Sequence, residues 1–211
     1  MPAQTKIAKL LNDPSGAFFN RMDTFRLTIN RMFSSFYMKK VLSLRGVTYG
    51  SHIAFYGIAR FRRQYGTSIQ IGSKCRFRSS FLSNNVGLNR PCFISTLRKD
   101  AKIVIGDQVG MSGTVIGCAE SITIGNNVLL GGNTFVTDFD WHPLKRDGKD
   151  IARSRPVVIE DDAFVGMNVI VLKGTHIGRG SVIGANSVVS GVIPPGVIAG
   201  GNPCKVIKPL P

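Results

Sequence analysis

Residues 157–189 read VVIEDDAFVGMNVIVLKGTHIGRGSVIGANSVV and repeat themselves every six positions. A β-branched aliphatic residue recurs through the stretch without a break, at Ile159, Val165, Val171, Ile177, Ile183 and Val189. Six is not the period of a helix, but it fits one short strand followed by a turn. The repeat therefore predicts a parallel β-solenoid. In such a fold the aliphatic side chain points into the core, and small residues or asparagine occupy corners that need a positive φ.

The repeat extends toward the N-terminus and is interrupted once. The same spacing links Ile124, Leu130 and Val136, and it links Ile105 to Met111 one residue out of phase. We expect a regular solenoid over residues 102–192, weaker coils over 51–100, and 18 residues per triangular coil. Residues 142–156, HPLKRDGKDIARSRP, break the count, so they are predicted to form a loop at one corner.

The N-terminal arm has a different period. Its apolar residues are spaced by four and three: Phe18, Met22, Phe25, Ile29, Met32 and Phe36. This spacing predicts an amphipathic helix, with Asp13-Pro14-Ser15 as its N-terminal cap. The helix would cap the open end of the solenoid, lie on an anionic membrane, or do both with two faces. We therefore divide the chain into a helical arm, 1–48, and a β-helix domain, 49–211, which includes the loop and a C-terminal tail.

Charge is concentrated in the first half of the chain. The net charge is +15, and residues 1–100 hold 17 of the 27 Lys/Arg but 3 of the 12 Asp/Glu. Such a half is expected to meet an anionic partner. No nucleic-acid-binding module is recognised, so an anionic membrane leaflet is preferred, at about 1 kcal/mol per surface cation. The cations of ARFRRQ (Arg60, Arg62, Arg63) and KCRFR (Lys74, Arg76, Arg78) alternate with aromatics at strand period.

No apolar run reaches the ~18 residues of a spanning helix, and no signal-peptide core is found. The four cysteines lack metal-site spacing and are expected to be reduced thiols. These features predict a cytoplasmic protein with peripheral contact on the inner face of the membrane. His52 and His176 are interpreted as structural, and no metal is expected.

Three segments together resemble a known family. DFDWHPL (138–144), the hexads that follow the loop, and IAGGNPCKVIK (198–208) are similar to the acyl-CoA-dependent sugar O-acetyltransferases. That branch includes the maltose, galactoside and xenobiotic enzymes and those of capsule and lipopolysaccharide assembly. The resemblance covers roughly residues 100–208. It implies a left-handed parallel β-helix, a homotrimer with sites between subunits, and acetyl-CoA as the acetyl donor.

The resemblance makes His142 the general base of a direct transfer without an acyl-enzyme. Acetyl transfer to a hydroxyl needs a proton acceptor near neutral pH, and imidazole suits this role. Pro143 favours an extended backbone at His142. Asp140 or Asp138 could fix the imidazole tautomer, bind a sugar hydroxyl or end a strand. Trp141 is expected to stack on a sugar, or else to serve as a core or subunit contact.

The resemblance also assigns positions to the two substrates. Acetyl-CoA would contact Phe164, Ala185, Ser190, Lys205, Lys208 and Arg179. Phe164 stands where relatives often carry Trp. Gly191 stands where they commonly carry Lys, so one phosphate contact is either missing or supplied by a neighbour such as Arg179. Many relatives carry an Asn one coil before the histidine, where it would bind the acceptor. This chain has Ser112 near that position.

The expected function is therefore transfer of acetyl to a sugar hydroxyl of a surface polysaccharide or lipopolysaccharide precursor. Two alternatives remain open at this stage: N-acylation of a nucleotide-linked amino sugar, and a non-catalytic trimeric scaffold. The sequence does not define the acceptor, the position acylated or the acyl length.

Overall fold

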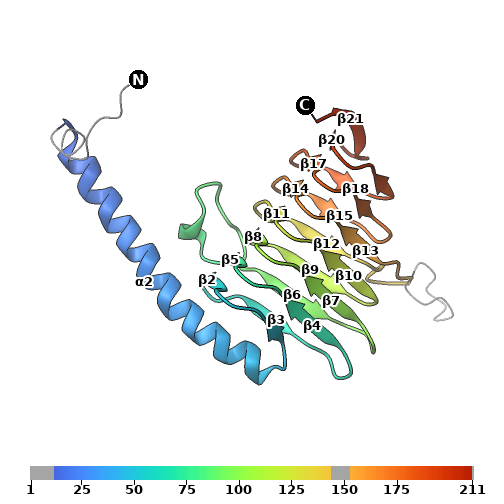
Figure 1. Cartoon of the computed structure of the whole chain (residues 1–211), viewed down its shortest axis with the longest axis horizontal. Helices are drawn as coiled ribbons and strands as arrows, with labels where there is room; N and C mark the ends of the chain where they lie inside the picture. Colours follow the sequence, from blue (N-terminus) through green and yellow to red (C-terminus); the bar gives the residue numbers. More distant parts are fainter. Residues whose placement is uncertain (1–11, 144–152, 211) are drawn as a thin grey trace.

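The computed structural model describes residues 12–143 and 153–210. One long helix, α2 (Pro14–Leu44), projects from the end of a stack of short strands (Figure 1). The strands form three sheets, and each turn of the chain adds one strand to each sheet.

Sheet A contains β1 (Thr48–Tyr49), β4 (Ser68–Ile71), β7 (Lys102–Ile105), β10 (Ser121–Ile124), β13 (Val157–Ile159), β16 (His176–Ile177) and β19 (Val192–Ile193). Sheet B contains β2 (Ala54–Tyr56), β5 (Arg76–Arg78), β8 (Gly110–Ser112), β11 (Leu129–Leu130), β14 (Phe164–Val165), β17 (Val182–Ile183), β20 (Val197–Gly200) and β21 (Lys205–Pro209). Sheet C contains β3 (Arg60–Arg62), β6 (Phe93–Thr96), β9 (Val115–Cys118), β12 (Phe135–Thr137), β15 (Ile170–Val171) and β18 (Val188–Val189).

The hexads set the register of these sheets. Ile159 pairs with Ile177 in sheet A, Val165 with Ile183 in sheet B, and Val171 with Val189 in sheet C, all in parallel. All six of these aliphatic side chains are buried. Between the sheets, the chain turns at residues with positive φ, including Asn127, Asn133, Asp162, Asn168 and Asn186. The predicted solenoid, its core positions and its asparagine corners are confirmed.

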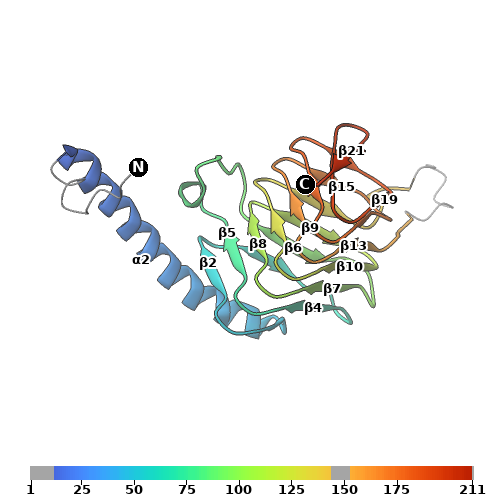
Figure 2. The ribbon, with the colours of Figure 1, turned by 45° about the horizontal axis from the view of Figure 1, so that its top comes forward.

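Helix α2 begins where the sequence predicts, because the Asp13 side chain accepts the Gly16 N–H at 2.9 Å and Pro14 opens the helix. Its packed face is not the predicted apolar stripe. Ser34, Met38 and Leu42 are buried, whereas four of the six stripe residues are more than 60% exposed: Phe18, Phe25, Met32 and Phe36. The N-terminal part of α2 therefore extends away from the solenoid (Figures 1 and 2).

The packed face of α2 covers an open edge of the solenoid. Strand β2 is the first strand of sheet B, so its outer amides have no neighbouring strand. Phe55 donates its N–H to Ser35 Oγ at 2.9 Å, and Gly57 donates to Ser34 Oγ at 3.2 Å. The last turns of α2 therefore cap the solenoid with hydroxyl groups as well as with apolar side chains.

The two ends of the solenoid are finished differently. In the first coils Phe55 stacks on Phe77 with ring centroids 4.7 Å apart, and Phe61 packs edge-on against both. A loop at 79–91, which includes a 3-10 turn (Phe81–Ser83), separates β5 from β6. At the other end β21 folds back antiparallel on β20. In the described part of the chain, no helix has the length and apolar character needed to cross a membrane.

Candidate active site

The predicted loop leaves and re-enters the solenoid at one point. After β12 the chain should turn from sheet C to sheet A, but β13 begins only at Val157. The two stems of the loop pair with each other: Asp140 N–H donates to Arg153 O at 3.0 Å, and Arg155 N–H donates to Asp138 O at 2.8 Å. Much of the loop itself, residues 144–152, lies outside the described residues. The stems fix residues 138–142 at the corner between sheets C and A, which we call the C/A corner.

Asp138 anchors this corner from inside the fold. Its side chain is fully buried and accepts the backbone N–H groups of Ala119, Glu120 and Ser121 at 2.7–2.8 Å. The Cys118 thiol donates to the same carboxylate at 3.3 Å, and burial, reinforced by Asp138, raises the pKa of that thiol. Among the roles that the sequence left open, these contacts favour the structural one, because the carboxylate satisfies the amides of the preceding corner.

Asp140 faces a lysine, Lys173, that the sequence pattern did not predict at this site. Its carboxylate forms an ion pair with Lys173, and both side chains are partly buried. Lys173 follows β15 at the same C/A corner one coil later. Its place at the equivalent corner, 33 residues after Asp140, is the sequence feature that could have predicted this pair. The pair compensates the charge of Asp140 beside the loop stem. Asp140 is two residues from the candidate base His142 in the sequence, but its direct partner is Lys173.

His142 follows directly after this anchored segment and is exposed to solvent. Trp141, next to it, packs on Phe139 with ring centroids 4.6 Å apart and lies over Gly117. A Cβ at Gly117 would come within 2.8 Å of the Trp141 ring, so this packing needs glycine there. About half of the Trp141 side chain remains exposed. The corner therefore presents an imidazole beside an aromatic wall.

The positions predicted to contact acetyl-CoA lie in several places on one chain. Ser190 follows β18 at the C/A corner, two coils beyond His142, and Ala185 lies at the corner between sheets B and C. Lys205 and Lys208 are exposed on β21. Arg179 lies at the corner between sheets A and B. A single chain therefore does not gather them into one site.

Arg179 differs from the two lysines because it has carboxylate partners. Its guanidinium lies 3.2 Å from Asp161 and 3.7 Å from Asp162. The Asn126 N–H and then Arg179 lower the pKa of the Asp161 carboxyl. An Arg179 engaged in these pairs is less available to a phosphate than Lys205 or Lys208, which have no carboxylate partner within the described ranges.

The outer face of sheet B carries the remaining predicted residues. Ser112 and Phe164 line a cavity of about 270 Å³ together with Arg76 and Arg78. Asn84, from the 79–91 loop, donates its side-chain amide to Ser112 Oγ at 3.0 Å. From the sequence, the two arginines were expected in a membrane-facing stripe, and Asn84 had no predicted role. The structure places all three beside the predicted acceptor position, so an amide is present next to Ser112 after all.

The other two histidines do not join this site. His176 Nε2 lies 2.7 Å from Glu160 Oε1 on the outer face of sheet A, and this hydrogen bond is the main cause of the lowered pKa of Glu160. His52 occupies an exposed turn with a φ of 58°. The described residues contain no group of three side chains arranged to hold a metal ion.

Comparison with known proteins supports the sequence resemblance. Residues 156–191 match the family model described as bacterial transferase hexapeptide (six repeats). The chain is 38% identical over 93 residues to a galactoside O-acetyltransferase of Escherichia coli, a match that covers 42–45% of either protein. It is also 38% identical over 117 residues to Escherichia coli WbbJ, whose name gives it the role of a lipopolysaccharide biosynthesis O-acetyl transferase.

That second match covers 50% of this chain and 60% of WbbJ, so the chain spans only about half the length of these curated relatives. Among solved structures, AntD, an N-acyltransferase from Bacillus cereus, is similar with a TM-score of 0.61 and 19% identity over 82% of this chain and 89% of AntD. At this identity the likeness concerns the fold alone. The hexapeptide match and the parallel three-sheet architecture confirm the predicted fold class, a left-handed parallel β-helix.

Proposed function

We propose that this hexapeptide-repeat chain is an O-acetyltransferase that moves acetyl from acetyl-CoA to a sugar hydroxyl of a surface polysaccharide or lipopolysaccharide precursor. One observation carries the proposal. Among the described residues from 102 to 192, the solenoid is interrupted at one corner, and there an exposed imidazole, His142, follows a segment held by the buried Asp138 carboxylate. The relatives named as sugar or lipopolysaccharide O-acetyltransferases support the choice of acceptor class.

In the proposed reaction His142 accepts the proton of the acceptor hydroxyl as its oxygen bonds to the acetyl carbonyl carbon. Acetyl-CoA would supply the activated thioester, whose C–S bond breaks when the new ester forms. The imidazolium then returns the proton to the departing sulfur, so His142 ends the cycle neutral. Asp140 is close in sequence and favours a transient positive charge on the ring, while Lys173 moderates that effect.

The groups available to acetyl-CoA fit its chemistry in part. Phe164 offers an exposed aromatic side chain, and Ala185 and Ser190 offer small exposed positions along which an extended chain could lie. Lys205 and Lys208 offer exposed ammonium groups for phosphates. Arg179 fits less well because it already contacts Asp161 and Asp162.

We propose further that the enzyme works as a homotrimer. His142 and Ser190 lie at the C/A corner, whereas Ser112 and Phe164 lie on the outer face of sheet B. A site that needs both groups is incomplete in one copy, and a neighbouring copy could supply the second group. Light scattering should give three times the monomer mass of 22.9 kDa. Mixing a His142→Ala chain with a Phe164→Ala chain should restore part of the activity if sites are shared.

The basic first half and the exposed aromatic residues of α2 also support peripheral contact with an anionic membrane surface. A lipid-linked glycan acceptor would be found at such a surface.

The test of the reaction is acceptor-dependent release of the CoA thiol, with mass spectrometry of the product. Hydroxyl sugars should be acetylated and yield esters that mild base cleaves. Base-stable amides formed from amino sugars alone would instead identify an N-acyltransferase. Absence of thiol release with every sugar, although acetyl-CoA binds, would favour a non-catalytic scaffold.

A further inference from the structure

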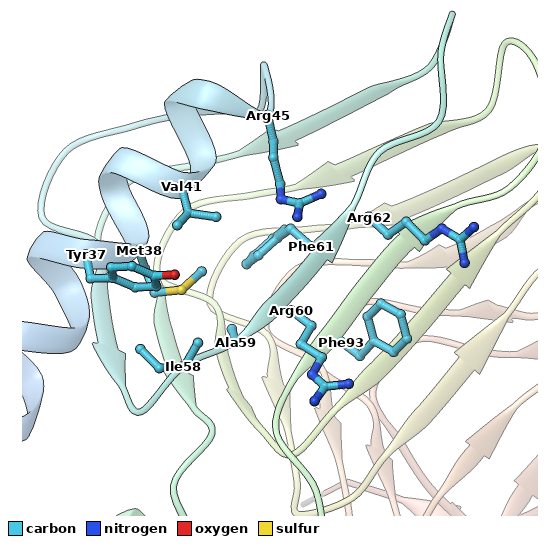
Figure 3. A pocket seen from close by; sticks show the side chains of 10 residues that line it. All are labelled: Tyr37, Met38, Val41, Arg45, Ile58, Ala59, Arg60, Phe61, Arg62 and Phe93. Carbon is cyan, nitrogen blue, oxygen red and sulfur yellow. The ribbon is translucent and has the colours of Figure 1, made fainter.

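A cavity of about 510 Å³ lies where the end of α2 meets the first coil (Figure 3). Its lining includes neither His142 nor any residue that lines the sheet B cavity. Met38 and Val41 of α2, with Ala59, Phe61 and Phe93 of the solenoid, form its apolar surface. Arg45 approaches from the end of the helix, and Arg60 and Arg62 stand on the same side of β3 on either side of Phe93 (Figure 3). We call this the arginine cavity.

The three arginines that line the arginine cavity have exposed guanidinium groups. Within residues 12–143 and 153–210, none of the three forms an ion pair with a carboxylate, and no acidic residue lines the cavity. Their charges add over a surface of low polarity, which strengthens the attraction for an anion. Guanidinium groups also match the geometry of phosphate oxygens.

Arg63, which the sequence placed in the same basic stripe, has another role. Its guanidinium donates to Arg45 O at 2.7 Å and to Thr67 O at 2.8 Å. Arg63 therefore fixes the end of α2 from which the Arg45 side chain begins. The ARFRRQ part of the stripe thus separates into one structural arginine, Arg63, and two that face the cavity, Arg60 and Arg62, which is a different arrangement from a uniformly solvated basic surface.

The apolar surface of the cavity continues onto the helix. Tyr37 lines the cavity, and Phe33, one turn earlier on the same face of α2, is 73% exposed. Ile58, at the rim, is about half exposed. A ligand with a phosphate at the arginines and a hydrocarbon chain along these residues would satisfy both the charges and the apolar surface.

We propose that the arginine cavity binds the phosphate head of an anionic lipid, with the lipid chain on the apolar residues of α2 and Ile58. This inference specifies the membrane contact proposed above and does not depend on acetyl transfer. It predicts one discrete site in addition to the diffuse attraction of the basic first half.

The test uses three soluble probes with the full chain: monododecyl phosphate, inorganic phosphate and dodecyl maltoside, each below its critical micelle concentration. Calorimetry should show binding of monododecyl phosphate and little or none of the other two. Equal affinity for inorganic phosphate would indicate a free-phosphate site, and equal affinity for the maltoside would indicate apolar adsorption. Either result overturns the proposal.

Two double variants separate the cavity from overall charge. Arg60→Glu with Arg62→Glu should weaken monododecyl phosphate binding at least tenfold. Lys99→Glu with Lys102→Glu makes the same change in net charge on exposed residues outside the cavity, and should leave the affinity within about twofold. An equal loss in both would show long-range electrostatics without a site.

Ile58→Asn, which changes no charge, should weaken the binding of monododecyl phosphate severalfold. An unchanged affinity would exclude the apolar part of the proposal.

Vesicles complete the comparison. Wild type should sediment with phosphatidylglycerol vesicles and not with phosphatidylcholine vesicles, and Arg60→Glu/Arg62→Glu should sediment less than the Lys99/Lys102 control. Circular dichroism and light scattering confirm that both variants fold alike. Acetyl transfer to a small soluble acceptor should be unchanged in both, so a failed lipid site and a failed catalytic proposal give different results.

Discussion

The two halves of the solenoid solve the same packing problem in different ways. From Lys102 onward each coil buries at least one apolar side chain per sheet, and polar corner residues with positive φ close the turns. In the first coils three phenylalanines fill the core, and two serines of α2 satisfy the edge strand. The outer surface differs as well, since the described part of the first half displays exposed aromatics and three arginines without an ion-pair partner, Arg45, Arg60 and Arg62. The second half is a regular series of coils with one loop, at the C/A corner. In the first half α2 caps the end of the solenoid, and the arginine cavity forms beside it.

The largest effect is expected at the interruption of the regular half. His142→Ala should lower turnover by roughly 10²–10⁴-fold, because the acceptor proton loses its base. His176→Ala is the matched control, since His176 lies in a hexad of the same half and pairs with Glu160 on the surface. It should keep nearly wild-type turnover. If both variants lost activity equally, the loss would reflect the framework and not the corner.

The second prediction concerns the anchor of that corner. Asp138→Ala leaves the amides of Ala119, Glu120 and Ser121 without their acceptor inside the fold. The free energy of unfolding should fall by roughly 2–4 kcal/mol, measured by urea denaturation. Turnover should also fall, because residues 139–142 lose their fixed position. A variant with wild-type stability would show that the buried carboxylate does not hold the corner.

The third prediction tests the cap of the irregular half. Replacing Ser34 and Ser35 with Ala removes the acceptors of Phe55 N–H and Gly57 N–H. Stability should decrease by roughly 1–3 kcal/mol, since partly buried donors are left unpaired. Ser43→Ala, near the same end of the helix but exposed, should cost less than about 0.5 kcal/mol. Equal effects would mean that α2 caps the solenoid through apolar contact alone.

The sequence predicts the regular half well because its information is local. The six-residue spacing of the aliphatic residues indicates which side chains are buried. Asn133 and Asn168 indicate corners because asparagine adopts a positive φ more readily than most residues. The helix cap was harder to predict. Counting apolar residues selected the Phe18–Phe36 stripe, but the free amides of β2 select the face with Ser34. That partner lies 23 residues away and has no periodic signature.

The candidate site shows the same limit. The motif around His142 marks the corner, yet the role of Asp138 depends on amides 17–19 residues earlier, and that of Asp140 depends on Lys173. Asn84 reaches Ser112 from an insertion that no repeat describes. These contacts are set by how coils stack, so single-residue preferences could not reveal them.

A smaller effect is expected at the C-terminal end, where cofactor phosphates would meet β21. Lys205→Glu should weaken CoA binding roughly tenfold at low salt, because a surface attraction of about 0.7 kcal/mol becomes a repulsion of similar size. The loss should shrink as ionic strength rises. Lys99→Glu carries the same charge change in the first half and should leave CoA affinity unchanged by calorimetry. Equal losses in both variants would assign the effect to net charge.

The smallest effect belongs to a surface contact between two hexads of the regular half. The hydrogen bond with His176, followed by the Arg179 N–H, lowers the pKa of Glu160 below its ordinary value. A carboxyl with a lowered folded-state pKa stabilises the fold above its unfolded pKa, and this contribution disappears as the pH falls through the folded pKa. The melting temperature of wild type should therefore slightly exceed that of Glu160→Gln at pH 7, and the difference should vanish as the pH falls through the lowered pKa of Glu160. Both groups are solvent-exposed, so the difference should remain smaller than that of any other variant above. A difference that grew on acidification would have the wrong sign for this carboxylate and would show that the hexads are held together here by the neutral groups.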